Sequence, residues 1–373
     1  MRLIVKFLLL PLLLGLSSCV DLGYYWQSVE GHVSLIKAAR PVDDWLADAQ
    51  TPEKLKAKLA LTQKIRAFAA EELKLPDNPS YKRYADLKRQ SVVWNVVAAP
   101  VLSLKLKTWC FPVAGCVGYR GYFSEAEAKL EAEELKKQDF DVSVYGVPAY
   151  STLGWSNWMG GDPLLSTFIG YPEGELARIV FHELAHQMVY VADDTAFNES
   201  FATAVERLGG ARWLAKYGSD TVKAEYEVYD GRRRQFKALT KATRRQLAEI
   251  YDKKKSLATD NTALTAIKNR AKNDDKNDNK VEIKNKIIES FKSQYELLKT
   301  SWNGYAGYDN WVKQANNAAF GALAAYDDGV PHFEALFEQQ GGHWQKFYTE
   351  VQKLAAMPKE ARQQALKKIN KDS

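Results

Sequence analysis

The chain has 373 residues, of which 46% are hydrophobic and 12% aromatic, so it is long enough to bury a sizeable core. Its net charge of +6 is small for this length and is spread along the sequence, which does not indicate a nucleic-acid-binding surface. The sequence has no Gly-rich phosphate loop, zinc-finger spacing or RNA-recognition aromatic motif, and we expect no nucleic-acid partner.

Residues 1–18 have the pattern of a secretory signal peptide. Arg2 and Lys6 precede an apolar run at 7–16 that is too short to span a membrane as a mature helix. The run ends in Leu-Ser-Ser-Cys, which resembles the lipidation motif of bacterial lipoproteins, with Cys19 as the lipidated first residue of the mature chain. A plain signal peptide followed by an incidental cysteine is the alternative.

The mature chain is expected to be lipid-tethered in the cell envelope and to face the periplasm. The sequence contains no second long apolar segment, so we expect the rest of the mature chain to be soluble and lipid-tethered. Val20, and not an aspartate, follows Cys19. By analogy with Gram-negative lipoprotein sorting, this favours the outer membrane over the inner one.

The first expected elements are a helix at 51–75, with Thr51 as its N-cap and Pro52 as its first helical residue, and strands within 91–109. Cys110 and Cys116 then bracket a loop that contains proline and glycine. In an exported protein this pattern predicts a small disulfide, and a two-thiolate metal site is the alternative.

Ser124 and Glu127 form a capping box at the start of a charged helix. Residues 139–155 alternate in polarity as a strand does, and Pro172 stands at the start of the next helix. A second helix is expected to run from about Thr195 to Gly209, where two consecutive glycines follow.

From there the sequence is helical to its end, with a long helical hairpin near 230–300. Its charged tip, at about 251–286, is rich in Lys, Asn and Asp and poor in aromatics, which indicates a solvated segment. A calcium-binding EF-hand is excluded because Lys280 and Lys286 occupy the positions that need Gly and Glu.

The segment FHELAHQ carries the chemistry. His182 and His186 are four residues apart, so on a helix they project from one face and can share a Zn²⁺ ion. Glu183 points to another side, where it can accept a proton from a water molecule at the metal. The flanking residues are apolar, and a buried charge without a partner is costly, so a metal site is favoured over a chance pattern.

A catalytic zinc needs a third protein ligand. Glu199 is the best candidate, because a tight turn between two antiparallel helices would bring it level with His186. Glu206 lies two turns further on, too far to bind the same ion, and either supports a ligand or is solvated. Asn198 is a candidate for hydrogen bonds to ligands or substrate.

The pair H-E-x-x-H and N-E-x-x-A resembles the gluzincins, the thermolysin-like metallopeptidases, although only residues 187–198 separate its two halves, fewer than in typical members. Nearly the whole mature chain resembles a narrower bacterial family of predicted zinc aminopeptidase lipoproteins. This second resemblance rests on WCFPVAGCVGYRGYF, AYSTLGW…DPLL, FHELAHQ…FNESFAT and NNAAF.

The resemblance implies a mainly α fold with a small β-sheet (α+β, zincin-like), in which residues 19–373 form a single metallopeptidase domain with the hairpin as an insertion. It implies zinc-dependent hydrolysis of a peptide substrate. By analogy with the gluzincins, the strand before the zinc helix, with Tyr150 and Ser151, would line the cleft, and a buried strand is the alternative. Tyr305 and Tyr308 are candidates for a donor to the oxyanion, and packing is the alternative role for either one. Endopeptidase activity, or a non-catalytic lipoprotein with structural zinc, are the alternatives.

Overall fold

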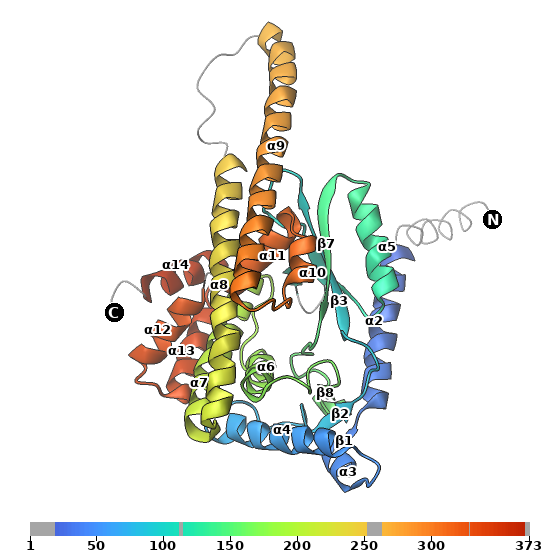
Figure 1. Ribbon diagram of the computed structural model, residues 1–373, viewed down its shortest axis with the longest axis vertical. Coiled ribbons are helices and arrows are strands. Elements are labelled where there is room, and N and C mark those ends of the chain that lie inside the picture. Colours follow the sequence, from blue (N-terminus) through green and yellow to red (C-terminus); the bar gives the residue numbers. More distant parts are fainter. Residues whose placement is uncertain (1–18, 112–114, 252–262, 328, 370–373) are drawn as a thin grey trace, which may run out of the picture.

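The computed structural model describes residues 19–111, 115–251, 263–327 and 329–369 (Figure 1). The predicted signal peptide and residues 252–262 of the charged segment lie outside the described residues. Lipidation of Cys19 therefore stays a prediction. No helix among the described residues is both long enough and apolar enough to cross a lipid bilayer.

The elements follow one another in a mostly helical order. They are α2 (Cys19–Ala38), β1 (Arg40–Pro41), α3 (Val42–Ala47), α4 (Glu53–Glu71), β2 (Arg83–Ala85), β3 (Val93–Pro100), β4 (Trp109–Phe111), β5 (Gly115–Val117), β6 (Arg120–Tyr122), α5 (Glu125–Lys136), β7 (Phe140–Val147), the 3-10 turn η1 (Asn157–Met159), β8 (Leu164–Leu165), α6 (Glu173–Ala185), α7 (Thr195–Tyr217), α8 (Asp220–Tyr251), α9 (Ala263–Ser301), α10 (Asp309–Lys313), α11 (Asn317–Asp327), α12 (Val330–Gln339), α13 (Trp344–Ala355) and α14 (Lys359–Lys368).

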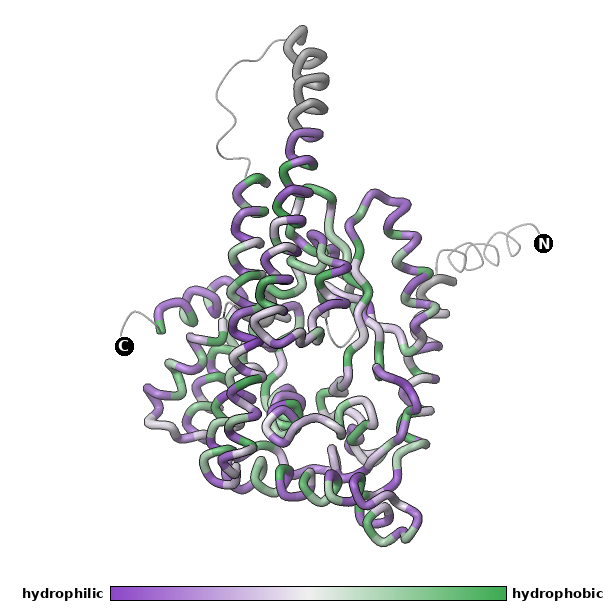
Figure 2. Tube along the Cα trace, in the orientation of Figure 1, coloured by the Kyte–Doolittle hydropathy of each residue, from purple (hydrophilic) through white to green (hydrophobic). Residues whose placement is uncertain are grey.

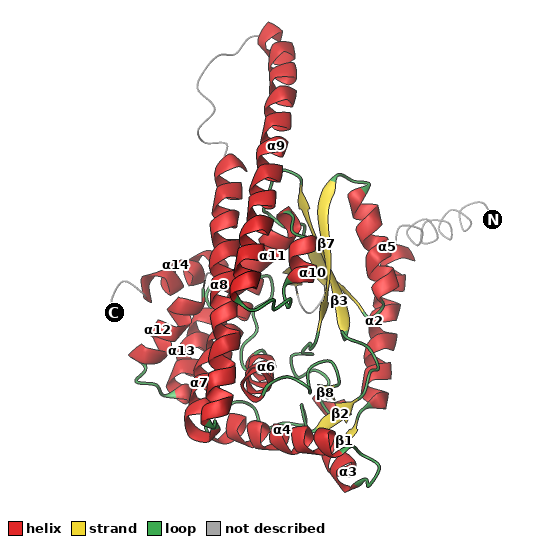
Figure 3. Cartoon of the chain, viewed as in Figure 1, coloured by secondary structure: helices red, strands yellow, loops and turns green. Residues whose placement is uncertain are grey.

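The predicted fold class, mainly helical with small sheets, is confirmed (Figure 3). The main sheet has the antiparallel order β6-β3-β7, and β3 pairs with β7 along its whole length, from Val93 opposite Val147 to Pro100 opposite Phe140. One face of β3 packs against α5 and the other against α11. Because β7 pairs only with β3 among the described strands, its second edge is free of strand pairing.

The principal core surrounds α6, which Figure 1 shows nearly end-on at the centre of the molecule. Leu176, Val180, Phe181 and Leu184 are fully or almost fully buried there. They pack with apolar residues of α4, α7, α12 and α13, and the apolar segments gather inside the helical body (Figure 2). Polar groups on α6 therefore lie in surroundings where an unpaired charge is unfavourable.

The long helical hairpin is formed by α8 and α9, which project together from the body (Figure 1). Helix α9 begins at Ala263, so the charged segment is helical from that residue on and not a tip throughout. Phe236 of α8 and Phe291 of α9 belong to a second apolar cluster at the base of the hairpin.

Two expected helix boundaries are wrong. Helix α7 continues through Gly209 and Gly210 to Tyr217. The glycine at 209 reflects the close approach of α6, because a Cβ there would lie 3.0 Å from a ring carbon of Phe181. Helix α4 begins at Glu53 with Pro52 as its N-cap, one residue later than expected.

The expected strand at 139–155 ends at Val147, which Pro148 follows. The expected N-cap of α5 is confirmed: the Ser124 side chain accepts the backbone N–H of Glu127, which is one of the two hydrogen bonds of a capping box.

Candidate metal centre

The end of α6 and the beginning of α7 bring three potential metal ligands together. His182 is in the last turn of α6, and His186 directly follows the helix as its C-cap, closer to the helix end than the sequence indicated. Glu199 lies in the second turn of α7. The Nε2 atoms of the two histidines are 3.1 Å apart, and they lie 3.4 Å and 3.7 Å from Oε2 of Glu199, His182 being the nearer.

This triangle fits a divalent metal ion. A tetrahedral zinc site with ligand distances of about 2.0–2.1 Å has ligand–ligand edges of about 3.3–3.4 Å. The three observed separations bracket that value. Two imidazole nitrogens and one carboxylate oxygen are also a donor set typical of catalytic zinc, with one position left for water. Both the types of ligand atom and the distances between them therefore fit a zinc ion.

The charge balance of the cluster also favours a cation. Burial lowers the pKa of His182, but the carboxylates of Glu199 and Glu206 outweigh it and raise that pKa well above its usual value. Burial lowers the pKa of His186 to about 4. Burial raises the pKa of Glu199, but the two histidines reverse this and the net shift is downward. The carboxylates thus hold a proton on His182 that a bound metal would replace.

Glu183 lies beside this cluster with its side chain almost fully buried. Burial raises its pKa to about 7, and the negative charges of Glu199 and Asp162 add to the shift against the opposing effect of His182. Among the described residues, no hydrogen bond or ion pair holds its carboxylate. A carboxylate with a pKa near neutrality and no fixed partner suits general base catalysis.

Glu206 supports His182 from the side away from the ligand triangle. Its Oε2 lies 3.0 Å from Nδ1 of His182, in an ion pair and not a well-aligned hydrogen bond. Its Oε1 accepts a hydrogen bond from Nη2 of Arg178, a buried residue of α6. Burial raises the pKa of Glu206, but Arg178 and His182 outweigh it and lower the pKa to about 2. Of the two roles left open by the sequence, the structure favours the first, because Glu206 contacts the candidate ligand His182 and is largely buried.

The connection between α6 and α7 is held by side chains at several points. Asn198 accepts the backbone N–H of Val191 through Oδ1 and donates Nδ2–H to the same residue's carbonyl, both at 2.8 Å. Its amide thereby closes the connection, so the expected contacts with metal ligands or substrate would have to compete with these two bonds. These two hydrogen bonds fix where α7 begins and thereby where Glu199 lies.

Two distant segments anchor the same connection. Asp194, the N-cap of α7, accepts two hydrogen bonds from the buried Arg362 of α14, at 3.0 and 2.7 Å. Asp193 Oδ1 accepts the backbone N–H of Cys116 at 2.5 Å. Cys116 is disulfide-bonded to Cys110, as predicted, so the β4–β5 hairpin braces the metal-site loop.

Tyr150 and Ser151, which were expected to line the cleft, each make a side-chain contact with another segment of the chain. The Tyr150 hydroxyl contacts Nδ1 of His32 on α2, and Ser151 Oγ donates to Asp162 at 3.4 Å. The buried Asp162 also accepts from the backbone and side chain of Thr152. Gln187, the residue after His186, donates to Asp162 at 3.5 Å, which ties the end of α6 to this loop.

Tyr305 and Tyr308 lie in the second apolar cluster, where Tyr308 stacks on Phe236 and Arg232 lies over the Tyr305 ring. Among the described interactions, none joins them to the ligand triangle. Sequence reasoning missed instead three tyrosines near Glu199, whose charge adds to burial in raising the pKa of each: Tyr119, Tyr145 and Tyr190. Tyr119 stands in the cysteine-containing motif, which was the available signal.

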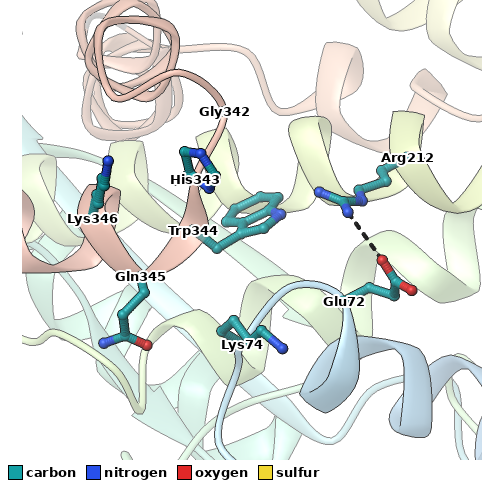
Figure 4. A pocket seen from close by; sticks show the side chains of 8 residues that line it. All are labelled: Glu72, Lys74, Arg212, Gly342, His343, Trp344, Gln345 and Lys346. Atoms are coloured by element: carbon teal, nitrogen blue, oxygen red, sulfur yellow. Dashed lines mark hydrogen bonds and ion pairs between the residues drawn. The ribbon is translucent and has the colours of Figure 1, made fainter.

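A separate pocket of about 300 Å³ lies at the N-terminus of α13 (Figure 4), lined by Glu72, Lys74, Arg212, Gly342, His343, Trp344, Gln345 and Lys346. Arg212 is on α7, about 20 Å along the helix axis from Glu199 at the usual rise per residue. Glu72 accepts hydrogen bonds from Arg212 and Lys216, so part of the positive charge is neutralised. None of the candidate catalytic groups lines this pocket.

Comparison with known proteins identifies a family for the chain. A sequence model of a protein family described as "Putative aminopeptidase" matches residues 23–366, which is most of the chain. No curated protein and no solved structure matches the chain significantly. The matched region contains the whole ligand cluster and its supporting residues.

Proposed function

The chain belongs to the putative aminopeptidase family, and on that premise we propose that it is a zinc-dependent peptidase that removes residues from the free amino end of peptides. His182, His186 and Glu199 would hold the metal. A peptide is the substrate that the family implies. Bound Zn²⁺ would supply Lewis acidity that polarises the scissile carbonyl and makes water acidic at neutral pH.

The observation that carries the proposal is the convergence of the three ligand atoms within 3.1–3.7 Å of one another. A purely structural zinc site has four protein ligands. Among the described His, Cys, Asp and Glu residues, only His182, His186 and Glu199 have ligand atoms close enough together to share one metal ion. The three-ligand set therefore favours a catalytic site, in which one position stays open, over a structural one.

Glu183 would accept a proton from the attacking water and deliver it to the leaving nitrogen. Its burial, its pKa of about 7 and its lack of a fixed partner among the described residues support this role. The hydroxyl group of Tyr119, Tyr145 or Tyr190 would donate a hydrogen bond to the developing oxyanion. All three lie close enough to Glu199 for its negative charge to raise their pKa. The free edge of β7, which carries Tyr145, would offer backbone groups to an extended substrate.

The proposed location is the cell envelope, with the enzyme tethered by a lipid on Cys19 and facing the periplasm. The outer membrane is favoured by Val20 after the cysteine. The disulfide between Cys110 and Cys116 supports an oxidising compartment.

Aminopeptidase activity is tested by comparing two peptides of the same sequence, one with a free amino terminus and one acetylated. We expect hydrolysis of the free peptide, loss of activity after chelation, and recovery when Zn²⁺ is restored. Cleavage of both peptides would replace exopeptidase with endopeptidase activity. Metal binding without hydrolysis of either peptide would favour the non-catalytic alternative.

A further inference from the structure

Helix α2 presents an uncovered apolar stripe. Leu22, Tyr25, Trp26 and Val29 are exposed by 64%, 40%, 71% and 60%. Their spacing of three, four and seven residues from the first places all four on one face of the helix. Large apolar side chains scattered singly are ordinary on a protein surface, whereas a contiguous stripe on one helix face marks an interaction site.

The orientation of this stripe is fixed by the opposite face of α2. Tyr24 stacks on Phe111 and meets Tyr122 edge-on, with ring centroids 5.5 Å apart in both pairs. Gln27 accepts the backbone N–H of Phe123 at 3.0 Å. A Cβ on Gly31 would lie only 2.2 Å from the Phe123 ring, so the helix lies directly on the β6 segment. The stripe cannot turn inward without breaking these contacts.

The chemistry of the stripe fits the interface of a lipid bilayer. Tyr and Trp are the residues that concentrate at this boundary, where the ring lies among apolar groups and the polar end stays hydrated. No Lys or Arg occurs between residues 19 and 36, so attraction to acidic lipids is not required. Helix α2 lies along one edge of the body (Figure 1).

Chain order identifies the bilayer as the occupant. Cys19, the proposed lipidated residue, precedes the first residue of the stripe by three positions. Leu22 follows Cys19 by less than one helical turn, about 5 Å along the axis. A lipid on Cys19 would hold the stripe at the membrane surface.

We propose that the stripe formed by Leu22, Tyr25, Trp26 and Val29 inserts into the bilayer interface and fixes how the protein faces the membrane. The inference rests on the proposed lipidation of Cys19 and depends on neither the metal nor the peptidase activity.

The test uses the full chain, expressed with its own leader, purified in detergent and reconstituted into phosphatidylcholine vesicles. A fluorophore is attached to Trp26→Cys and, as a matched control, to Leu130→Cys on α5, where the native side chain is 68% exposed. Cys110 and Cys116 do not react because they are disulfide-bonded, and the parent chain gives the background from Cys19. Quenching is measured with nitroxide-labelled lipid and with aqueous iodide.

The expected result is lipid quenching at position 26 at least about threefold stronger than at 130, with iodide quenching in the opposite order. Adding Leu22→Ser and Val29→Ser should make position 26 behave like position 130, while circular dichroism stays unchanged. Equal quenching at the two positions in the parent pair overturns the proposal. So does failure of the chain to bind vesicles. Shielding of position 26 from both quenchers that grows with protein density would show a second copy of the chain there instead.

Discussion

At the scale of single residues, the surroundings of His182 set how well the cluster can bind metal. Nε2 of this histidine faces the other two ligands, and Nδ1 faces Glu206, which Arg178 holds in turn. A carboxylate behind a metal-binding histidine fixes the orientation of the ring and raises its basicity. Nδ1 of His186 has no such partner among the described residues, so the support of the two histidines is unequal.

Replacing Glu206 with glutamine should therefore weaken zinc binding by about 10- to 100-fold, which is the usual cost of losing such a partner. The measurement is a competition titration against a chelating dye. Glu72→Gln is the matched control, because Glu72 pairs with Arg212 and Lys216 in the distant pocket. Unchanged zinc affinity in Glu206→Gln would remove Glu206 from the site.

The clustering of His182, His186 and Glu199 was predictable from the sequence, and the groups around them were not. His182, Glu183 and His186 share one helical turn, so the local period alone places them. Glu199 follows after a short connection. The contact of Glu206 with His182 depends on how closely α7 packs on α6, and Tyr119 reaches the site from a separate hairpin. Neither relation leaves a local pattern, and the choice of Tyr305 and Tyr308 as oxyanion donors rested on residue type alone.

At the scale of elements, the close approach of α6 and α7 determines the ligand geometry. From the sequence we expected the helix to end at Gly209 and Gly210, because glycine often follows the last residue of a helix. In the structure they are the positions where a side chain would collide with α6 or its neighbours: a Cβ on Gly209 would lie 2.6 Å from a methyl group of Leu73. A packing requirement in the helix interior gives the same sequence signal as a stop.

Gly209→Ala should destabilise the protein by about 1–3 kcal/mol, because the added methyl group overpacks a full core. Gly231→Ala is the control. Gly231 is in α8, has no atom within 4 Å of the added carbon, and should gain about 0.5–1 kcal/mol from helix propensity. Urea unfolding of both variants measures the two effects. A loss of stability in both, or in neither, would contradict the packing explanation.

The α6–α7 connection gives a second prediction at this scale. Asp194→Ala leaves the guanidinium of Arg362 buried without its carboxylate, and breaking such a pair costs about 3–5 kcal/mol. Arg207→Ala is the comparison, because its pair with Glu334 is more exposed and should contribute about 1 kcal/mol or less. Equal losses in the two variants on denaturant unfolding would show that α14 does not anchor the connection.

At the scale of the whole molecule, metal binding should be linked to folding. The carboxylates of Glu183, Glu199 and Glu206 lie close enough to raise one another's pKa, and this repulsion is relieved when a cation binds. A ligand that binds only the folded state at a hundred times its dissociation constant adds about 2.7 kcal/mol of stability. We therefore expect the unfolding temperature of the chelated protein to rise by a few degrees on addition of Zn²⁺.

The same titration on His186→Ala is the control, since this variant should show little or no zinc-dependent rise. A rise as large as that of the native chain would place the stabilising metal elsewhere. The overall architecture that makes this linkage possible was predicted only as a class, because the register of the sheet and the contact of α14 with Asp194 depend on contacts between distant parts of the chain.

The most direct test of the central claim is the Glu183→Gln variant, examined for zinc content and for hydrolysis of an unblocked peptide. The substitution removes the proposed general base and keeps all three ligand side chains. We expect one zinc per chain, as in the native protein, with hydrolysis slowed by about 10²- to 10⁴-fold. Native rates in a variant that retains its zinc would contradict it.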